Sequence, residues 1–179
     1  MSLLPIVIAP DRRLKTACKP VEQIDDAIST MMQNMLETMY DAPGIGLAAP
    51  QIGSNVRLIV VDVAREGQDK QPYCMVNPEI TWKSDEIIMM NEGCLSLPDI
   101  FVDIERPEQI RVSFLDEKEE TQELEADGLL ARCILHEIDH LDGVLHVDYL
   151  SRIKRELILR KLSKLKPTLM AERAERHAS

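Results

Sequence analysis

Apolar side chains recur at spacings of three and four between residues 25 and 40, which predicts an amphipathic helix. Asp25 comes just before this stretch and is a residue type that commonly caps the N-terminus of a helix. A stripe of this kind usually packs into the protein core. Its members are Ile28, Met31, Met32, Met35, Leu36 and Met39.

Two more helices are predicted in the C-terminal third of the chain. The first begins at Asp127 and ends near Gly143, because a Gly often follows the last turn of a helix. The second runs from about Ser151 to Lys166, and Pro167 is expected to end it. Its apolar side carries Ile153, Leu157, Leu162 and Leu165.

Strands are predicted between the first two helices. The glycine- and proline-rich residues 41–53 form a loop, and a β-branched run of strand length follows at 56–63. Further candidate strands lie at residues 72–77, 79–90, 101–105, 109–115 and 121–125. Since their connections are short, hairpins and antiparallel pairing are expected. The pattern therefore predicts an α+β fold, with antiparallel sheets around a central helix and helices near both ends.

Length and composition favour one domain. The chain has 179 residues, 45% of them hydrophobic, and its apolar runs are too short to span a bilayer. We expect residues 1–166 to form a single domain and 167–179 a basic, flexible tail. No secretory signal is recognised, and the four cysteines lack CxxC spacing, so reduced cysteines in a cytoplasmic protein are expected.

Charge divides the chain into an acidic body and a basic end. The net charge is −10, which argues against broad nucleic-acid binding. Residues 151–179, however, carry nine Lys or Arg against three Asp or Glu. This end is either a solvated helix face or a surface that docks on an anionic partner such as ribosomal RNA.

The strongest chemical signal is the sequence HEIDH at residues 136–140, on the second predicted helix. Side chains at i and i+4 project from the same face, so His136 and His140 can reach one metal ion. Glu137 lies beside them and can take a proton from a metal-bound water. The pattern indicates a metal-dependent hydrolase.

The third ligand has two candidates. His146 completes the pattern HExxHxxGxxH of the metzincin proteases, but those enzymes place a Met turn after the third His, and only Met170 follows here. Cys94, in EGCLS at residues 92–96, is the other candidate.

The segment GIGLAA at residues 44–49 satisfies a dinucleotide-binding fingerprint. That fingerprint needs a strand before it and a helix after it, whereas here a helix precedes and a strand follows. The bare backbone of Gly46 can instead approach a peptide, and the Gln51 amide can donate to a developing oxyanion.

Three motifs in this order, GIGLAAPQ at 44–51, EGCLS at 92–96 and HEIDH at 136–140, closely resemble those of the peptide deformylases. The resemblance covers nearly the whole chain. It implies that Cys94, His136 and His140 bind one divalent metal ion, physiologically Fe²⁺, with Zn²⁺, Ni²⁺ or Co²⁺ as possible substitutes.

The same resemblance implies removal of the formyl group from N-formylmethionyl nascent peptides, with release of formate, in a prokaryotic cytoplasm. Glu137 would activate the metal-bound water, and Gln51 and the backbone N–H of Leu95 would hold the oxyanion. No membrane and no specific DNA partner is expected, and ribosome docking would use the C-terminal helix. The expected substrate-binding residues are Ile45, Gly46, Met90, Gly93, Leu129 and Cys133. Glu92 is expected to be a structural carboxylate.

Three positions depart from the common family pattern. Leu135 stands where Gln is usual, and Phe101 stands where some members carry an Arg that contacts substrate. Phe101 should favour apolar residues beyond Met in the peptide. His146, where many members have an aromatic residue, is expected at the pocket edge or the surface.

A non-enzymatic alternative is a structural zinc site in a module that docks on ribosomes through its basic end. Structural zinc sites normally have four protein ligands, and here the fourth would have to be Glu137 or a distant residue. An open catalytic site is therefore the preferred interpretation.

Overall fold

The computed structural model describes residues 2–64 and 67–177, with side chains up to residue 171. The helices are α1 (Asp26–Asp41), α2 (Gly128–Leu141) and α3 (Arg152–His177), and short 3-10 helices are η1 (Arg12–Lys15), η2 (Ala49–Ile52) and η3 (His146–Tyr149). The strands are β1 (Gly46–Ala48), β2 (Leu58–Val61), β3 (Tyr73–Lys83), β4 (Ile87–Cys94), β5 (Leu97–Pro107), β6 (Gln109–Leu115) and β7 (Thr121–Asp127).

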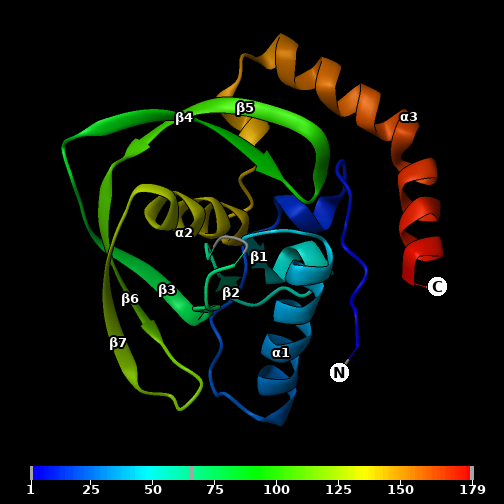
Figure 1. Ribbon diagram of the computed structural model, residues 1–179. Coiled ribbons are helices and arrows are strands. Elements are labelled where there is room, and N and C mark those ends of the chain that lie inside the picture. The colour runs from blue at the N-terminus through cyan, green and yellow to red at the C-terminus, as the bar shows by residue number, and fades with distance from the viewer. Residues whose placement is uncertain (1, 65–66, 178–179) are drawn as a thin grey trace.

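The strands form two antiparallel sheets, and α2 lies between them (Figure 1). One sheet has the order β1-β2-β3-β6-β7, and the other consists of β4 paired with β5. The helix α2 contacts strands of both sheets. The predicted α+β fold, with antiparallel sheets around the HEIDH helix, is confirmed.

The central position of α2 follows from its sequence, which is apolar on more than one face. Ile134, Ile138 and Leu141 are buried against a core that includes Met75 of β3 and Val112 of β6. Each buried aliphatic side chain of this size contributes roughly 1.5–3 kcal/mol to stability. These apolar residues pack one side of α2 into the core, so the polar residues of the HEIDH motif can lie on its other side without disturbing the core.

The N-terminal cap of α1 is confirmed, because the Asp25 carboxylate accepts a hydrogen bond from the backbone N–H of Ile28 (2.9 Å). Several predicted boundaries were wrong, and the predicted strand at 101–105 is the middle of the longer β5. The predicted loop at residues 41–53 contains β1, which pairs with β2. The predicted strand at 79–90 is the end of β3 and the start of β4, separated by a turn in which the Ser84 hydroxyl donates to the carbonyl of Glu86 (3.1 Å).

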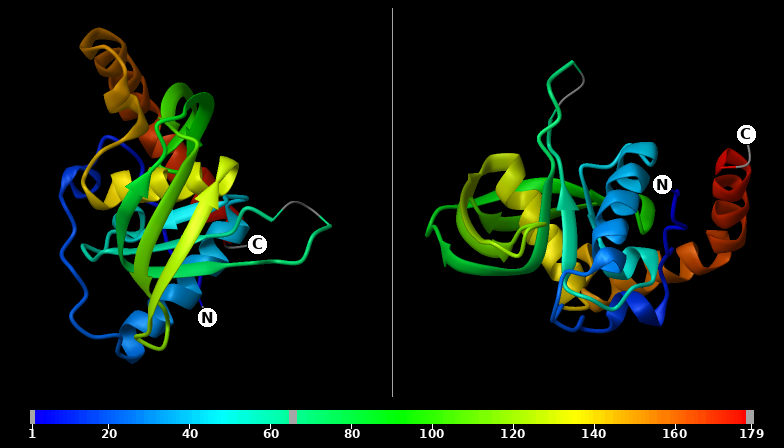
Figure 2. Two further views of the ribbon diagram at one scale, coloured as in Figure 1. Left: turned by 90° about the vertical axis from the view of Figure 1, so that its left-hand side faces the viewer. Right: turned by 90° about the horizontal axis from the view of Figure 1, so that it is seen from below.

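The expected end of the last helix at Lys166 is wrong, because α3 continues through Pro167 to His177. A proline inside a helix removes one hydrogen bond and bends the axis, which need not end the helix. Figures 1 and 2 show that the axis of α3 turns along its length. Leu162 of α3 is buried, and the Lys166 ammonium group lies 3.3 Å from the Asp11 carboxylate, so this part of α3 is attached to the rest of the domain.

That residues 167–179 form a flexible tail stays a prediction, and residues 178 and 179 lie outside the described part of the chain. None of the helices in the described ranges combines the length and apolar composition needed to cross a membrane.

Gly143, just past α2, is a position where only glycine fits. Its φ is +74°, and a Cβ there would lie 2.8 Å from backbone atoms of Lys15. Gly128, at the other end of α2, also has a positive φ (+50°) but nothing within 4 Å of an added Cβ. A side chain at either position would have to adopt a positive φ, but only at residue 143 would it also overlap neighbouring backbone atoms.

We expect Gly143→Ala to lower the free energy of unfolding more than Gly128→Ala. The left-handed conformation costs each variant about 1–2 kcal/mol, and overpacking against Lys15 adds roughly 1–3 kcal/mol at residue 143 only. Urea denaturation of both variants measures the difference. Equal losses would contradict the close approach of η1 to the end of α2.

Candidate active site

The helix α2 places His136 and His140 one turn apart on the same face. Their ring centroids are 4.9 Å apart, and both side chains are buried. Burial of two imidazoles beside one another is costly unless their nitrogens are bonded. The arrangement therefore calls for a common partner.

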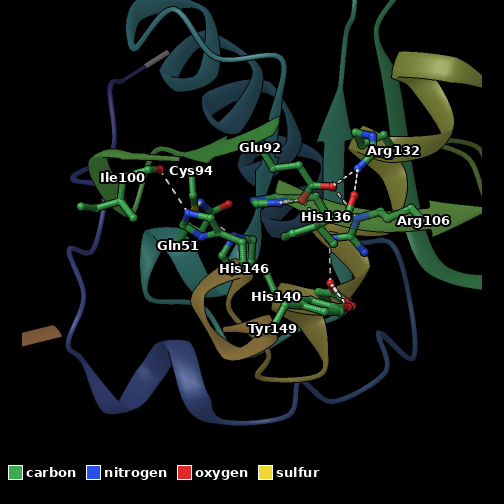
Figure 3. A network of polar contacts seen from close by, with 12 residues as sticks. Gln51, Glu92, Cys94, Ile100, Arg106, Arg132, His136, His140, His146 and Tyr149 are labelled. Atoms are coloured by element: carbon green, nitrogen blue, oxygen red, sulfur yellow. Dashed lines mark hydrogen bonds and ion pairs between the residues drawn. The ribbon is translucent and has the colours of Figure 1, made fainter. Parts of the chain in front are cut away.

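Cys94 reaches the same point from the end of β4 (Figure 3). Its Sγ lies 3.2 Å from Nε2 of His140, and the ligand atoms of Cys94, His136 and His140 all lie within 4.8 Å of one another. The structure thus brings together the three residues predicted as ligands. A thiolate with two imidazoles suits zinc, iron and related transition metals.

Glu92 orients His136. The Glu92 carboxylate lies 3.0 Å from Nδ1 of His136 and also accepts hydrogen bonds from Arg106 (2.6 Å) and Arg132 (2.7 Å). Burial alone would raise the pKa of Glu92, but the hydrogen bonds from His136 and Arg106 lower it to about 2. With Nδ1–H donated to Glu92, His136 presents Nε2 for a metal ion, as ligating histidines commonly do. This contact supports the expected structural role of Glu92.

The sequence analysis did not identify two arginines of this network, Arg106 and Arg132. Arg106 of β5 also pairs with Asp139 (2.9 Å), whose carboxylate accepts a hydrogen bond from the Tyr149 hydroxyl (2.8 Å). Arg132 of α2 donates to the backbone carbonyls of Ile104 and Ile88 as well as to Glu92. For Arg132 the sequence offered one signal, because a single cation within the apolar run LLARCIL indicates a buried and paired charge.

Glu137 lies beside this network with one oxygen unused. The residue is 3% exposed, and its Oε2 has no hydrogen-bond partner among the described residues. Burial raises the pKa of Glu137 to about 7. Gly46 packs directly against it, because an added Cβ would overlap Oε1 of Glu137 and lie 2.7 Å from Sγ of Cys133. Glycine is therefore required at residue 46 by its contact with Glu137 and Cys133, and the expected approach of its backbone to a peptide stays a prediction.

A cavity of about 430 Å³ opens at these groups. Its wall includes Glu137, His136 and Cys94 together with seven residues predicted to bind substrate or oxyanion, which are Ile45, Gly46, Gln51, Gly93, Leu95, Leu129 and Cys133. Met90, also predicted to line the pocket, is half-buried opposite Ile104 and is not among the lining residues. Most of the lining is apolar, as in sites for small apolar ligands.

Gln51 is buried with a fixed orientation. Its Oε1 accepts a hydrogen bond from the backbone N–H of Ala48 (2.7 Å). Its Nε2 consequently faces Ser96 Oγ (3.2 Å) and Cys94 Sγ (3.6 Å). The donor end of the amide therefore points to the ligand cluster.

The three departures from the common pattern lie in different places. Leu135 is buried in the core, and Phe101 is 67% exposed at the cavity wall with its ring against Gly93. The expectation that His146 lies at the pocket edge or surface is wrong, since it is 1% exposed. Its Nε2 lies 3.1 Å from the carbonyl oxygen of Ile100, because η3 packs beneath β5. His146 is outside the group of possible metal ligands found in the described residues, so a metzincin ligand set is not formed.

A thiolate, two imidazoles and a buried carboxylate at the wall of a cavity are the groups that a metallohydrolase uses. Comparison with known proteins shows which family of metallohydrolases the chain resembles. The family model for polypeptide deformylase matches residues 3–156. The peptide deformylase of Methylocella silvestris is 50% identical over 167 residues, covering 92% of this chain and 85% of that relative.

Solved structures agree with the sequence comparison. The crystal structure of peptide deformylase from Ehrlichia chaffeensis matches with a TM-score of 0.88 and 40% identity, covering 93% of this chain and 98% of that one. The same enzyme in complex with actinonin matches with a TM-score of 0.87 and 42% identity, covering 92% and 98% of the two chains. The chain therefore belongs to the polypeptide deformylase family and is an enzyme of that family.

We expect the wild-type protein to bind one equivalent of Co²⁺ with a thiolate charge-transfer band in its absorption spectrum. Alanine at Cys94, His136 or His140 should lower the affinity at least 100-fold, because each removes a ligand atom. Titration with Co²⁺ after treatment with a chelator measures both quantities.

Cys133→Ala is the matched control. Burial raises the pKa of Cys133, and its thiol donates to the carbonyl of Ile45 (3.3 Å), so it stays protonated. The Cys133→Ala variant should keep the band. Loss of the band in this variant, or its retention in Cys94→Ala, would contradict the assigned ligand set.

Proposed function

We propose that the enzyme removes the N-formyl group from the formylmethionine that begins newly synthesised polypeptides, releasing formate, in the cytoplasm of a prokaryotic cell. The observation that carries this proposal is the position of Glu137. One of its carboxylate oxygens has no partner in the described chain, and it lies at the cavity wall beside the three grouped ligands.

The residues present fit a divalent metal ion. Cys94, His136 and His140 would hold it, and Glu92 fixes the ring of His136. Such an ion polarises a carbonyl group and makes a water molecule a stronger acid. We take Fe²⁺ as the physiological ion, with Zn²⁺, Ni²⁺ or Co²⁺ as substitutes, because each accepts thiolate and imidazole ligands.

Glu137 carries the proton. Its carboxylate accepts a proton from the attacking water and returns it to the amine that leaves when formate is released. The negative charge that develops on the formyl oxygen needs donors that are already in place. Gln51 supplies one, since its Oε1 is held by Ala48 and its N–H groups face Cys94. The backbone N–H of Leu95, at the same wall, supplies the other.

Selectivity follows from the shape of the cavity. The unbranched Met side chain would occupy the apolar part lined by Ile45, Leu129 and Cys133. The backbone of Gly46 and Gly93 would lie along the peptide. A formyl carbon carries only hydrogen, so a close fit around it excludes the acetyl group by its bulk.

Replacing Glu137 with Gln should lower kcat at least about 100-fold, the lower range for general acid–base groups, while metal content stays at one equivalent. The assay is anaerobic formate release from a formyl-Met tripeptide by the Fe²⁺-loaded enzyme. Glu125→Gln, on the exposed edge of β7, is the matched control and should keep wild-type turnover. Near-normal turnover in Glu137→Gln would refute the assigned role, and an inactive, correctly metallated wild type would refute the proposed function.

We further propose that α3 docks on the ribosome. Its solvent side combines exposed apolar residues, Ile153 and Leu157, with the exposed cations of Arg160, Lys161 and Lys164. Cations on one helix face can pair with the phosphates of ribosomal RNA. The rest of the chain is strongly acidic, so this face is the suitable contact.

Reversing three charges on α3, with Arg160→Glu, Lys161→Glu and Lys164→Glu, should weaken co-sedimentation with ribosomes and reduce its salt dependence. A control with the same net charge change on other surfaces, Lys19→Glu, Lys83→Glu and Lys118→Glu, should bind more tightly than the α3 variant. Equal binding of the two triple variants would contradict docking through α3. Formate release from a free tripeptide should stay unchanged in both.

A further inference from the structure

His146 is a buried polar residue that the proposed reaction does not use. It begins η3 and is 1% exposed. Its Nε2 lies 3.1 Å from the carbonyl oxygen of Ile100, on β5, which is in the cavity wall (Figure 3). A buried imidazole costs free energy unless its polar atoms are bonded, so this contact calls for an explanation.

The ring nitrogen that faces Ile100 is the donor. A ring nitrogen of histidine forms a hydrogen bond with an acceptor only when it carries a hydrogen atom. A backbone carbonyl can only accept, and the Nδ1 of His146 has no hydrogen-bond partner in the described chain. The proton is therefore on Nε2.

The segment of β5 that His146 contacts is irregular. Glu92 pairs with Val102 and Cys94 pairs with Leu97, so residues 98–101 of β5 lie opposite the single residue Gly93 of β4. Asp99 within this segment has a φ of +60°. Such a bulge makes fewer regular hydrogen bonds to the neighbouring strand than the paired residues on either side of it.

The same segment forms one wall of the cavity. Pro98, Asp99, Ile100 and Phe101 all line it, and the side chains of Asp99 and Phe101 are exposed, so they lie at its mouth. The reacting groups and the apolar pocket lie deeper, at Glu137 and Cys133. A peptide whose first side chain fills the pocket would leave the cavity along the bulged segment.

We propose that His146 is a positioning residue, whose Nε2–H holds the Ile100 carbonyl and so fixes residues 98–101 as the wall that contacts peptide residues after the first. This role rests on the proposed deformylase function. It concerns binding of the peptide beyond Met, so removal of the N–H should change KM and leave kcat nearly unaltered.

The test compares His146→Phe, which keeps an aromatic ring without a donor, with His146→Gln, whose amide N–H has nearly the same reach. Both are loaded with Fe²⁺ and assayed on a formyl-Met tripeptide and on formyl-Met amide, which ends before the mouth. For His146→Phe we expect KM for the tripeptide to rise roughly 3- to 10-fold, the effect of one lost hydrogen bond. The kcat should stay within about twofold, KM for formyl-Met amide should not change, and Gln should restore much of the loss.

Val147→Ala is the structural control. Val147 is fully buried next to His146 in the same helical turn, and its truncation should lower the thermal midpoint without changing either KM. Hydrogen exchange of the backbone amides of residues 99–102, followed by mass spectrometry, gives a readout independent of turnover. It should be faster in His146→Phe than in wild type and Val147→Ala.

The proposal is overturned if His146→Phe leaves KM for the tripeptide unchanged, if Val147→Ala raises it equally, or if His146→Phe loses its metal ion. An inactive, correctly metallated wild type would instead overturn the deformylase function, and with it the peptide contact. Even then the hydrogen-exchange comparison would decide whether His146 holds the segment.

Discussion

The buried carboxylate of Glu92 is the interaction on which the rest of the site depends. It joins β4 to β5 through Arg106 and to α2 through Arg132 and His136, with every one of these side chains nearly excluded from solvent. A buried charge is tolerated only when its partners are in place, and removing one partner of such a network costs roughly 3–5 kcal/mol. The two-stranded sheet and the central helix are thereby held in one relative position.

That position determines the chemistry of the neighbouring residues. Since Glu92 and Cys94 lie on the same strand, the contact that orients His136 also delivers the thiol to His140. Arg106 extends the restraint to Asp139, one residue before His140. These ion pairs thus hold the possible ligands Cys94, His136 and His140 in one rigid arrangement, close enough to bind a single metal ion.

Local sequence patterns predicted the elements and part of the site. The i,i+4 spacing gave His136 and His140 a shared face, and composition gave the strand and helix types. Cys94 could be joined to them only through the family resemblance, because its contact with α2 depends on how β4 packs, which no local period encodes. The arginine partners of Glu92 and the burial of His146 could not be predicted for the same reason. The helix α3 continues through Pro167 because a proline inside a helix removes one hydrogen bond and bends the axis without having to end the helix.

The unequal pairing of β4 and β5, with residues 98–101 opposite Gly93, separates this part of the cavity wall from the regular ladder of the sheet. Residues can be inserted or deleted in that bulge while the ladder beyond Val102 and the helix α2 keep their register. The width of the mouth could then change in evolution, or by engineering, without disturbing the reacting groups. Related enzymes with different peptide preferences could arise in this way from a single catalytic frame.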